Sequence, residues 1–222
     1  VTEETKNAIT KNNLKLKPNQ LVLSGNHAVL SALQNTQRKS FYLISTKDRH
    51  LKWEKSIKDL GLTTKIKIKT KEQLDIINDF KPHQNVILIV EPLKRISLDE
   101  FLIEQQFISK HPLRIIILDQ VTDPQNVGAI IRSAYAFKMD ALALSQTNSP
   151  IESIGMSKAS SGTIEKLKII ELSNMSRAIG KLQDANFHVY GLANGGYGSV
   201  LDLEKEDGCL LYTSPSPRDG RE

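Results

Sequence analysis

The stretch LRIIILDQVTDPQNVGAIIRSA, residues 113–134, decides the expected fold. Its first seven residues form a nearly unbroken apolar and β-branched run, which indicates a strand buried on both faces, as in a parallel sheet. Asp123 and Pro124 predict a turn, and Asn126 stands where a helix N-cap is expected. The helix after the turn is expected to bury an apolar stripe made of Val127, Ile130, Ile131, Ala134 and Phe137.

A polar strip beside this stripe is the first candidate site. Gly128, Arg132 and Tyr135 follow one another at helical spacing, just after a strand end, which is where open α/β sheets bind their ligands. Gly128 would allow a substrate backbone to approach, and the fork of the Arg132 guanidinium matches a phosphate. Taken singly, Asn126 could be only a helix cap and Arg132 only an exposed helical arginine.

The rest of the chain continues the β-α alternation in two domains. The second domain, 113–211, is expected to be a parallel sheet with covering helices, and another buried strand is expected to begin at Cys209. The first, 21–95, is expected to be a small α/β layer domain, preceded by a disordered lead-in at 1–20 and followed by a linker at 96–112. Capping boxes are expected at Thr70–Gln73 and Ser97–Glu100. The expected elements are strands at 41–45, 64–68, 85–90, 141–144, 167–172 and 187–192, and helices at 27–34, 51–60, 71–80, 127–137, 153–160 and 174–186.

The formal net charge of +5 is concentrated in the first half of the chain. Residues 1–112 carry 19 basic and 12 acidic side chains, whereas residues 113–222 carry 11 and 13. This asymmetry is what an interface for phosphates would produce, and solvated surface lysines would produce it equally well. Cys209 is the only cysteine, so no internal disulfide can form and a cytoplasmic location is expected. Scattered histidines predict no metal site, and the absence of a glycine-rich fingerprint argues against a dinucleotide-binding oxidoreductase.

The candidate strand-turn-helix resembles the first motif of the SpoU/TrmH family of RNA 2′-O-ribose methyltransferases. That motif is D-x-V-x-D-P-x-N-x-G followed by a helix with R-S-A. Gly25–Val29 resembles the G-x-x-A-V opening of the family's substrate-binding domain, and Met156–Gly162 resembles its helix of the K-x-A/S-x-G type. Val189–Asn194 resembles the strand and loop that border the cofactor. The likeness spans about residues 21–211 and is nearest to enzymes that methylate a guanosine of 23S rRNA. The matched fixed positions of the first motif are Asp119, Val121, Asp123, Pro124, Asn126, Gly128, Arg132, Ser133 and Ala134.

The resemblance implies a methyl transfer from S-adenosylmethionine to a ribose 2′-hydroxyl of RNA, with ribosomal RNA as partner. It implies that Arg132 is the catalytic arginine and Asn126 its partner. It also implies a small N-terminal α/β substrate-binding domain and a parallel-sheet catalytic domain of the trefoil-knot (SPOUT) type. The cofactor-binding residues that it implies are Leu192, Ala193, Asn194 and Gly195.

The chain departs from the family after Leu211. A second motif, rich in Gly and Glu, and a third of the S-L-N-V-S type are expected to follow and are absent from the sequence, where residues 212–222 read as a non-native tail. The SPOUT domain is therefore expected to be incomplete, the family's homodimer doubtful and turnover negligible. The alternative is a non-catalytic RNA-binding module, which predicts salt-sensitive RNA binding without a response to S-adenosylmethionine.

Overall fold

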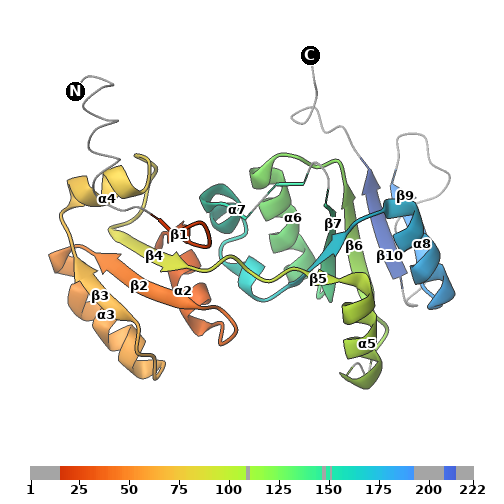
Figure 1. Cartoon of the computed structure of the whole chain (residues 1–222), viewed down its shortest axis with the longest axis horizontal. Helices are drawn as coiled ribbons and strands as arrows, with labels where there is room; N and C mark the ends of the chain where they lie inside the picture. The colour runs from red at the N-terminus through yellow and green to blue at the C-terminus, as the bar shows by residue number, and fades with distance from the viewer. Residues whose placement is uncertain (1–15, 109–110, 147–148, 151, 193–207, 214–222) are drawn as a thin grey trace, which may run out of the picture. The chain divides into compact units, whose positions relative to one another are not determined.

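The computed structural model describes residues 16–108, 111–146, 149–150, 152–192 and 208–213 (Figure 1). The chain divides into two compact units. Unit 1 is formed by residues 1–93 and 152–165, and unit 2 by residues 94–151 and 166–222. The division expected from the sequence was contiguous, whereas here the segment 152–165 packs with the N-terminal unit. The physical reason is that Ile154 packs against an apolar cluster of unit 1 and Glu152 pairs with Arg38.

Unit 1 is built on a four-stranded sheet with the order β1-β4-β2-β3. Strand β4 pairs antiparallel with both β1 and β2, and β3 adds to β2 in parallel. The short strand β1 was not expected from the sequence. The strands of unit 1 are β1 (Leu21–Ser24), β2 (Ser40–Ser45), β3 (Lys65–Ile68) and β4 (Val86–Val90), and its helices are α2 (Asn26–Gln34), α3 (Lys47–Asp59), α4 (Lys71–Ile77), α7 (Ile154–Ala159) and the 3₁₀ turn η1 (Thr163–Glu165).

Strand β4 (VILIV) is buried along its whole length because both faces of the sheet are covered. Side chains alternate along a strand, so Leu88 points into the cluster that holds Val29 and Trp53, from α2 and α3. Ile87 points into the opposite cluster, which holds Leu74 of α4 and is closed by Ile154 of α7. An apolar strand without alternation is therefore a central strand here.

Unit 2 is built on a six-stranded sheet with the order β5-β8-β7-β6-β10-β9, and every neighbouring pair in it is parallel. The expected parallel sheet is thus confirmed. The strand expected at Cys209 is β10, and it lies between β6 and β9 and continues through Tyr212 and Thr213, two residues into the expected tail. The strands are β5 (Ile96–Ser97), β6 (Arg114–Asp119), β7 (Ala141–Ser145), β8 (Lys168–Leu172), β9 (His188–Leu192) and β10 (Gly208–Thr213), and the helices are α5 (Leu98–Ile108), α6 (Pro124–Ala136) and α8 (Met175–Asp184).

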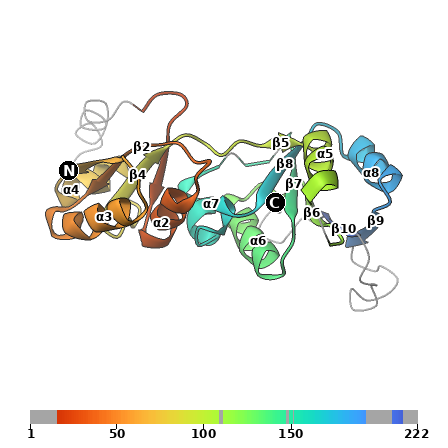
Figure 2. The ribbon, with the colours of Figure 1, turned by 90° about the horizontal axis from the view of Figure 1, so that it is seen from below.

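Helices cover both faces of this sheet (Figure 2). Ile115 and Ile117 of β6 face the cluster that contains Phe101 of α5 and Leu182 of α8. The alternate residues Ile116 and Leu118 point to the other face, on which α6 lies. This two-sided cover explains why β6 reads as an unbroken apolar run.

Both expected capping boxes are present. The capping box from Thr70 to Gln73 is present in both directions. At the start of α5, the Ser97 amide donates to Glu100 and the Glu100 amide donates to the Ser97 hydroxyl, at 2.8 and 3.1 Å.

The expected lead-in at residues 1–20 falls mostly outside the described residues. Within the described part of the chain, no helix has the length and apolar character needed to cross a membrane.

Candidate functional site

The candidate site begins where β6 ends and α6 starts. Asp123, rather than Asn126, is the N-cap of α6, and its Oδ1 accepts a hydrogen bond from the Gln125 amide at 2.9 Å. Pro124 occupies the first helical position, where its fixed φ suits the helix and no amide hydrogen is missed. The expectation that Asn126 is the cap is therefore wrong, because the Asp-Pro pair starts the helix three residues earlier. Asn126 lies in the first turn and is half-buried.

The buried side of α6 differs in part from the expected apolar stripe. Val127, Ile131 and Ala134 are buried as predicted. Phe137 is 70% exposed, and it is the C-cap of α6, which ends at Ala136. Gly128 is buried too, so it lies with the apolar stripe and not on the exposed strip with Arg132. Its expected role of admitting a substrate backbone is not favoured by this position.

Arg132 lies on the exposed side of α6. Within the described part of the chain its guanidinium has no hydrogen bond and no ion pair. Tyr135, one turn further along the helix, is also exposed, and the Lys166 ammonium lies 5.4 Å from the centre of its ring. The accessible side of α6 therefore presents cations and an aromatic ring, a combination that suits a phosphate with its attached nucleoside.

Arg132 follows Asn126 by six residues on the same helix. Helix geometry separates two such positions by about 9 Å along the axis and about 120° around it. Both residues thus lie on one helix, but helix geometry alone does not bring their side chains together. A ligand that meets both must extend along the first two turns of α6.

The cofactor residues implied by the sequence follow β9. Leu192 is the last residue of β9. Ala193, Asn194 and Gly195 lie outside the described residues. Strand β10 separates β9 from β6, and all three run parallel, so their carboxyl ends share one edge of the sheet. With strands spaced about 4.8 Å apart, the chain leaves β9 roughly 10 Å from the point at which it leaves β6.

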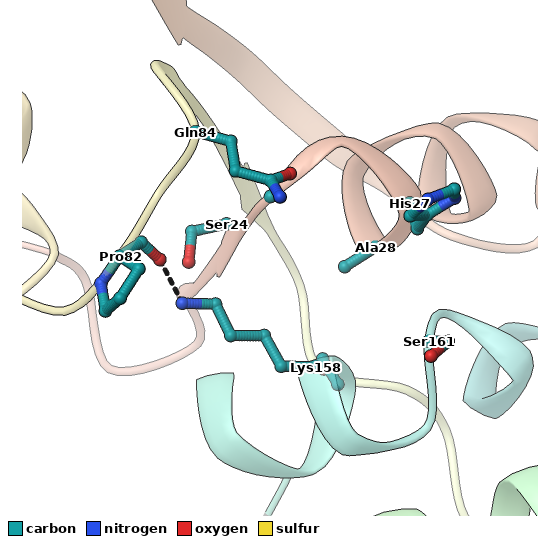
Figure 3. Close-up of a pocket in the computed structure, with 9 residues that line it drawn as sticks. Ser24, His27, Ala28, Pro82, Gln84, Lys158 and Ser161 are labelled. Atoms are coloured by element: carbon teal, nitrogen blue, oxygen red, sulfur yellow. Dashed lines mark hydrogen bonds between the residues drawn. The ribbon is translucent and has the colours of Figure 1, made fainter.

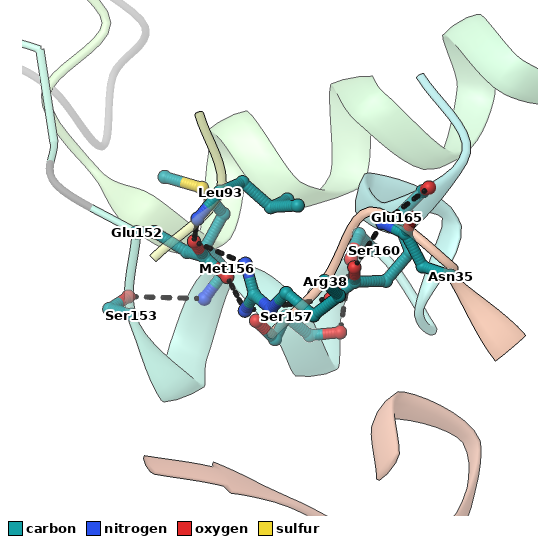
Figure 4. A network of polar contacts seen from close by, with 9 residues as sticks. All are labelled: Asn35, Arg38, Leu93, Glu152, Ser153, Met156, Ser157, Ser160 and Glu165. Carbon is teal, nitrogen blue, oxygen red and sulfur yellow. Dashed lines mark hydrogen bonds and ion pairs between the residues drawn. The ribbon is translucent and has the colours of Figure 1, made fainter. Parts of the chain in front are cut away.

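A second polar centre lies in unit 1, around a buried arginine (Figure 4). The Arg38 side chain is 1% exposed, and its two terminal nitrogens donate to the two carboxylate oxygens of Glu152 at 3.0 and 2.5 Å. A carboxylate oxygen of Glu165 lies 3.6 Å from the same guanidinium. The Glu165 carboxylate also accepts a hydrogen bond from the side-chain amide of Asn35 at 2.9 Å. Glu152 also accepts from the Leu93 amide at 2.8 Å. This network joins the loop after α2 to both ends of the segment 152–165.

The charges of this network are not balanced, since two carboxylates share one guanidinium. Burial raises the pKa of Glu165, and the negative charge of Glu152 adds to the rise. The Arg38 charge and the Asn35 hydrogen bond oppose it and do not cancel it. The geometry of this network supports a structural role, because the residues that contact Arg38 and Glu152 here belong to unit 1 and the guanidinium is inaccessible to a ligand.

Two protein-family models match this chain, one in its N-terminal part and one in its C-terminal part. Residues 22–95 match the RNA 2′-O ribose methyltransferase substrate binding family, and residues 113–212 match the SpoU rRNA Methylase family. A putative TrmH family tRNA/rRNA methyltransferase of Staphylococcus aureus is 31% identical over 83% of this chain and 74% of its own length. A protein of the same description from Staphylococcus epidermidis is 29% identical over 84% and 74%. The chain belongs to the SpoU/TrmH family of tRNA/rRNA methyltransferases.

Solved structures agree with this family at the level of the fold. The SpoU methyltransferase AviRb from Streptomyces viridochromogenes, in complex with the cofactor AdoMet, superposes with a TM-score of 0.72 at 15% identity, over 98% of this chain and 85% of AviRb. An rRNA methyltransferase from Sinorhizobium meliloti superposes with a TM-score of 0.70 at 19% identity, over 95% and 78%. The expected fold class, an N-terminal α/β substrate-binding domain with a parallel-sheet SpoU domain, is confirmed.

Helix α7 belongs to the methylase part of the sequence but packs with the N-terminal unit. Residues 152–165 fall inside the SpoU rRNA Methylase match, yet they pack within unit 1. No local pattern in the sequence indicates this packing, because Arg38 stands among many basic residues and its partners Glu152 and Glu165 are 114 and 127 positions away. The only available signal was the likeness of Met156–Gly162 to a family helix, which identified the segment but not its neighbours.

Proposed function

We propose that this SpoU/TrmH protein is an RNA ribose 2′-O-methyltransferase that uses S-adenosylmethionine and acts on ribosomal RNA, with a 23S guanosine as the expected target. The observation that carries the proposal is Arg132, an accessible guanidinium without a protein partner among the described residues, on the helix that follows central strand β6. That helix begins within the family's D-x-V-x-D-P-x-N-x-G motif. An accessible arginine in this position can bind the phosphate beside a reacting ribose.

The cofactor supplies an electrophilic methyl group when bound, so the protein has to position the ribose and assist loss of the hydroxyl proton. The parallel carboxyl ends of β6, β10 and β9 support a cofactor site at this edge of the sheet. Leu192, Ala193, Asn194 and Gly195 would form its border after β9. The AdoMet complex of the structural neighbour AviRb supports the same cofactor.

Arg132 would act as a cation and not as a base. Arginine keeps its proton at any physiological pH, so a neutral guanidine is too costly to accept the ribose proton. Its planar fork can instead hold a phosphate through two hydrogen bonds and stabilise negative charge that develops on the ribose oxygen, while another acceptor takes the proton. Asn126, in the first turn of the same helix, would orient the nucleotide from the strand end.

The test is a methyl-transfer assay with 23S rRNA and methyl-labelled S-adenosylmethionine, run with the chain in excess over RNA so that one transfer per RNA suffices for detection. Digestion with alkali locates the label, because a methylated 2′-oxygen blocks cleavage of the adjoining phosphodiester. Label in an alkali-resistant dinucleotide that contains guanosine is expected. Label on a base, or label that Arg132→Lys leaves unchanged, would contradict the proposal.

Multiple turnover by this 222-residue polypeptide is expected to be negligible. The resemblance assigns part of the cofactor pocket to two later motifs that do not occur within residues 1–222, and a pocket that encloses less of a ligand binds it more weakly. Steady-state turnover at micromolar S-adenosylmethionine would show this part of the proposal to be wrong.

A non-catalytic RNA-binding module is the competing function, and the basic first half of the chain favours it. It predicts that the chain binds rRNA with a strong salt dependence and that saturating S-adenosylmethionine changes neither this affinity nor the RNA. Calorimetric titration with S-adenosylmethionine separates the two functions, since only the methyltransferase needs a cofactor site.

A further inference from the structure

Two segments that are far apart in the sequence line one cavity in unit 1 (Figure 3). One is the Gly25–Val29 motif at the start of α2, and the other is the Met156–Gly162 motif of α7. The cavity, here the α2–α7 pocket, has a volume of about 320 Å³. Its lining consists of Ser24, Gly25, His27, Ala28, Pro82, Gln84, Ser157, Lys158 and Ser161.

Basic side chains line the pocket. They are Lys158 and His27, and the described residues of its lining include no carboxylate. Lys158 donates one hydrogen bond to the Pro82 carbonyl, which leaves two of its three donors for a ligand. Burial lowers the pKa of Lys158, and the neighbouring Lys81 charge lowers it further. An anion that enters the pocket would stabilise the charged form of a lysine in this position.

The start of α2 adds main-chain donors on the same side. Gly25 is the N-cap, with φ at 96°, and it offers no side chain to cap the helix. Gln84 satisfies the Asn26 amide at 2.8 Å, but the next two amides, of His27 and Ala28, are first-turn groups that the helix itself cannot pair. With the helix dipole, such amides favour an anion.

Two buried hydroxyls in the pocket wall favour a polar ligand. Ser24 is 1% exposed and Ser157 is 2% exposed, and among the described residues neither Oγ has a hydrogen-bond partner. In Figure 3 the Ser24 oxygen is directed toward the end of the Lys158 side chain. Buried hydroxyls are normally paired, so two unpaired ones in the wall favour a polar ligand beside Lys158.

We propose that the α2–α7 pocket binds a backbone phosphate of the RNA substrate, held by Lys158, the first-turn amides of α2 and the Ser24 hydroxyl. This inference rests on the proposed function, since it assigns part of the RNA contact to unit 1. The volume is at the lower end of the range for small-ligand sites, which suits one phosphate with its sugar. The contact reads no base, so it positions RNA without selecting its sequence.

The test measures binding of a fluorescein-labelled single-stranded 12-nucleotide RNA by anisotropy over a range of KCl concentrations. Lys158→Gln is compared with Lys55→Gln, which removes an exposed lysine of α3 outside the pocket. Lys158→Gln should weaken binding roughly fivefold to tenfold and reduce the slope of log K against log salt by about 0.7, the value for one phosphate contact on a single strand. Lys158→Arg should retain most of the affinity.

Two further measurements keep the outcome unambiguous. Ser24→Ala removes only the hydroxyl oxygen, and it should weaken RNA binding about twofold to fivefold without loss of stability, which Trp53 fluorescence in urea reports. Equal losses for the two lysine variants, or an unchanged salt slope for Lys158→Gln in a folded protein, would overturn the pocket assignment. Wild-type protein that binds no RNA would instead overturn the proposed function itself.

Discussion

Helices α6 and α7 both belong to the part of the chain that matches the SpoU rRNA Methylase family, yet they use charge in opposite ways. On α6, Arg132 is exposed and has no partner among the described residues. Around α7, the charges of Arg38, Glu152 and Glu165 are buried and paired with one another. The difference teaches that an arginine's surroundings decide its use. An accessible, unpaired guanidinium can bind a substrate, whereas a buried, doubly paired one fixes the fold.

The largest expected effect is on stability, from the buried arginine. Arg38→Met leaves the Glu152 and Glu165 carboxylates without their cation, and it should lower the free energy of unfolding of unit 1 by about 3–5 kcal/mol. Urea unfolding followed by fluorescence of the single tryptophan, Trp53, which is buried in the core of unit 1, measures this. Arg49→Met is the matched control, because Arg49 forms an exposed pair with Asp48 at 3.7 Å. A control loss as large as that of Arg38→Met would remove the contrast between buried and exposed charge.

Arg132→Lys should lower the rate of methyl transfer and leave stability nearly unchanged. The rate of the single methyl transfer should fall by about 10²–10³-fold, because lysine keeps the charge but loses the two-point contact. Stability should stay within about 0.5 kcal/mol, since the position is exposed. The control is Arg177→Lys, the same exchange at an exposed arginine of α8, which should leave the rate unchanged. Near-normal transfer by Arg132→Lys would contradict the phosphate clamp.

The close packing of α7 on α2 can be tested at a glycine. Gly162 has φ at 82°, and an added Cβ would lie 2.7 Å from Ser31 Cβ and 3.1 Å from the His27 carbonyl oxygen. Gly162→Ala should therefore cost about 2–4 kcal/mol, as the sum of left-handed strain and overpacking. Gly61→Ala has similar strain, with φ at 65°, but no atom within 4 Å of the added Cβ, and should cost only about 1–2 kcal/mol. Equal costs by urea unfolding would mean that the α2–α7 contact is loose.

The smallest expected effect is a pH dependence from Glu165. Because its pKa is raised in the folded protein, its contribution to stability is fully present below its ordinary value of 4.5 and is lost as the pH rises through the raised pKa. Glu165→Gln imitates the protonated form, so the variant should gain stability relative to wild type as the pH increases from 4.5 toward neutrality. Urea unfolding at a series of pH values checks this. A difference that is constant with pH would show that Glu165 titrates normally.

Much of unit 2 was predictable because its signals are local. The apolar run of β6 indicated a strand covered on both faces, and the Asp123-Pro124 turn indicated the helix that carries Arg132. The exact start of that helix was not predictable from the motif, because Asp123 and Asn126 are both good N-caps and only the backbone path from β6 selects the first. The prediction that Phe137 joins the buried stripe was wrong because a periodic pattern does not show where a helix ends.

The sequence by itself determined the family, the parallel sheet and the two residues of α6 proposed for the chemistry, since a motif of consecutive residues carries its own local geometry. Only the tertiary structure decided that segment 152–165 packs with the N-terminal sheet, that Arg38 is buried between two carboxylates, and that the Gly25–Val29 and Met156–Gly162 motifs line one pocket. These contacts join residues far apart in the sequence, and Arg38 and Glu152 are 114 positions apart. Neither periodicity nor charge count contains such pairings, because they depend on which surfaces bury each other when the chain folds.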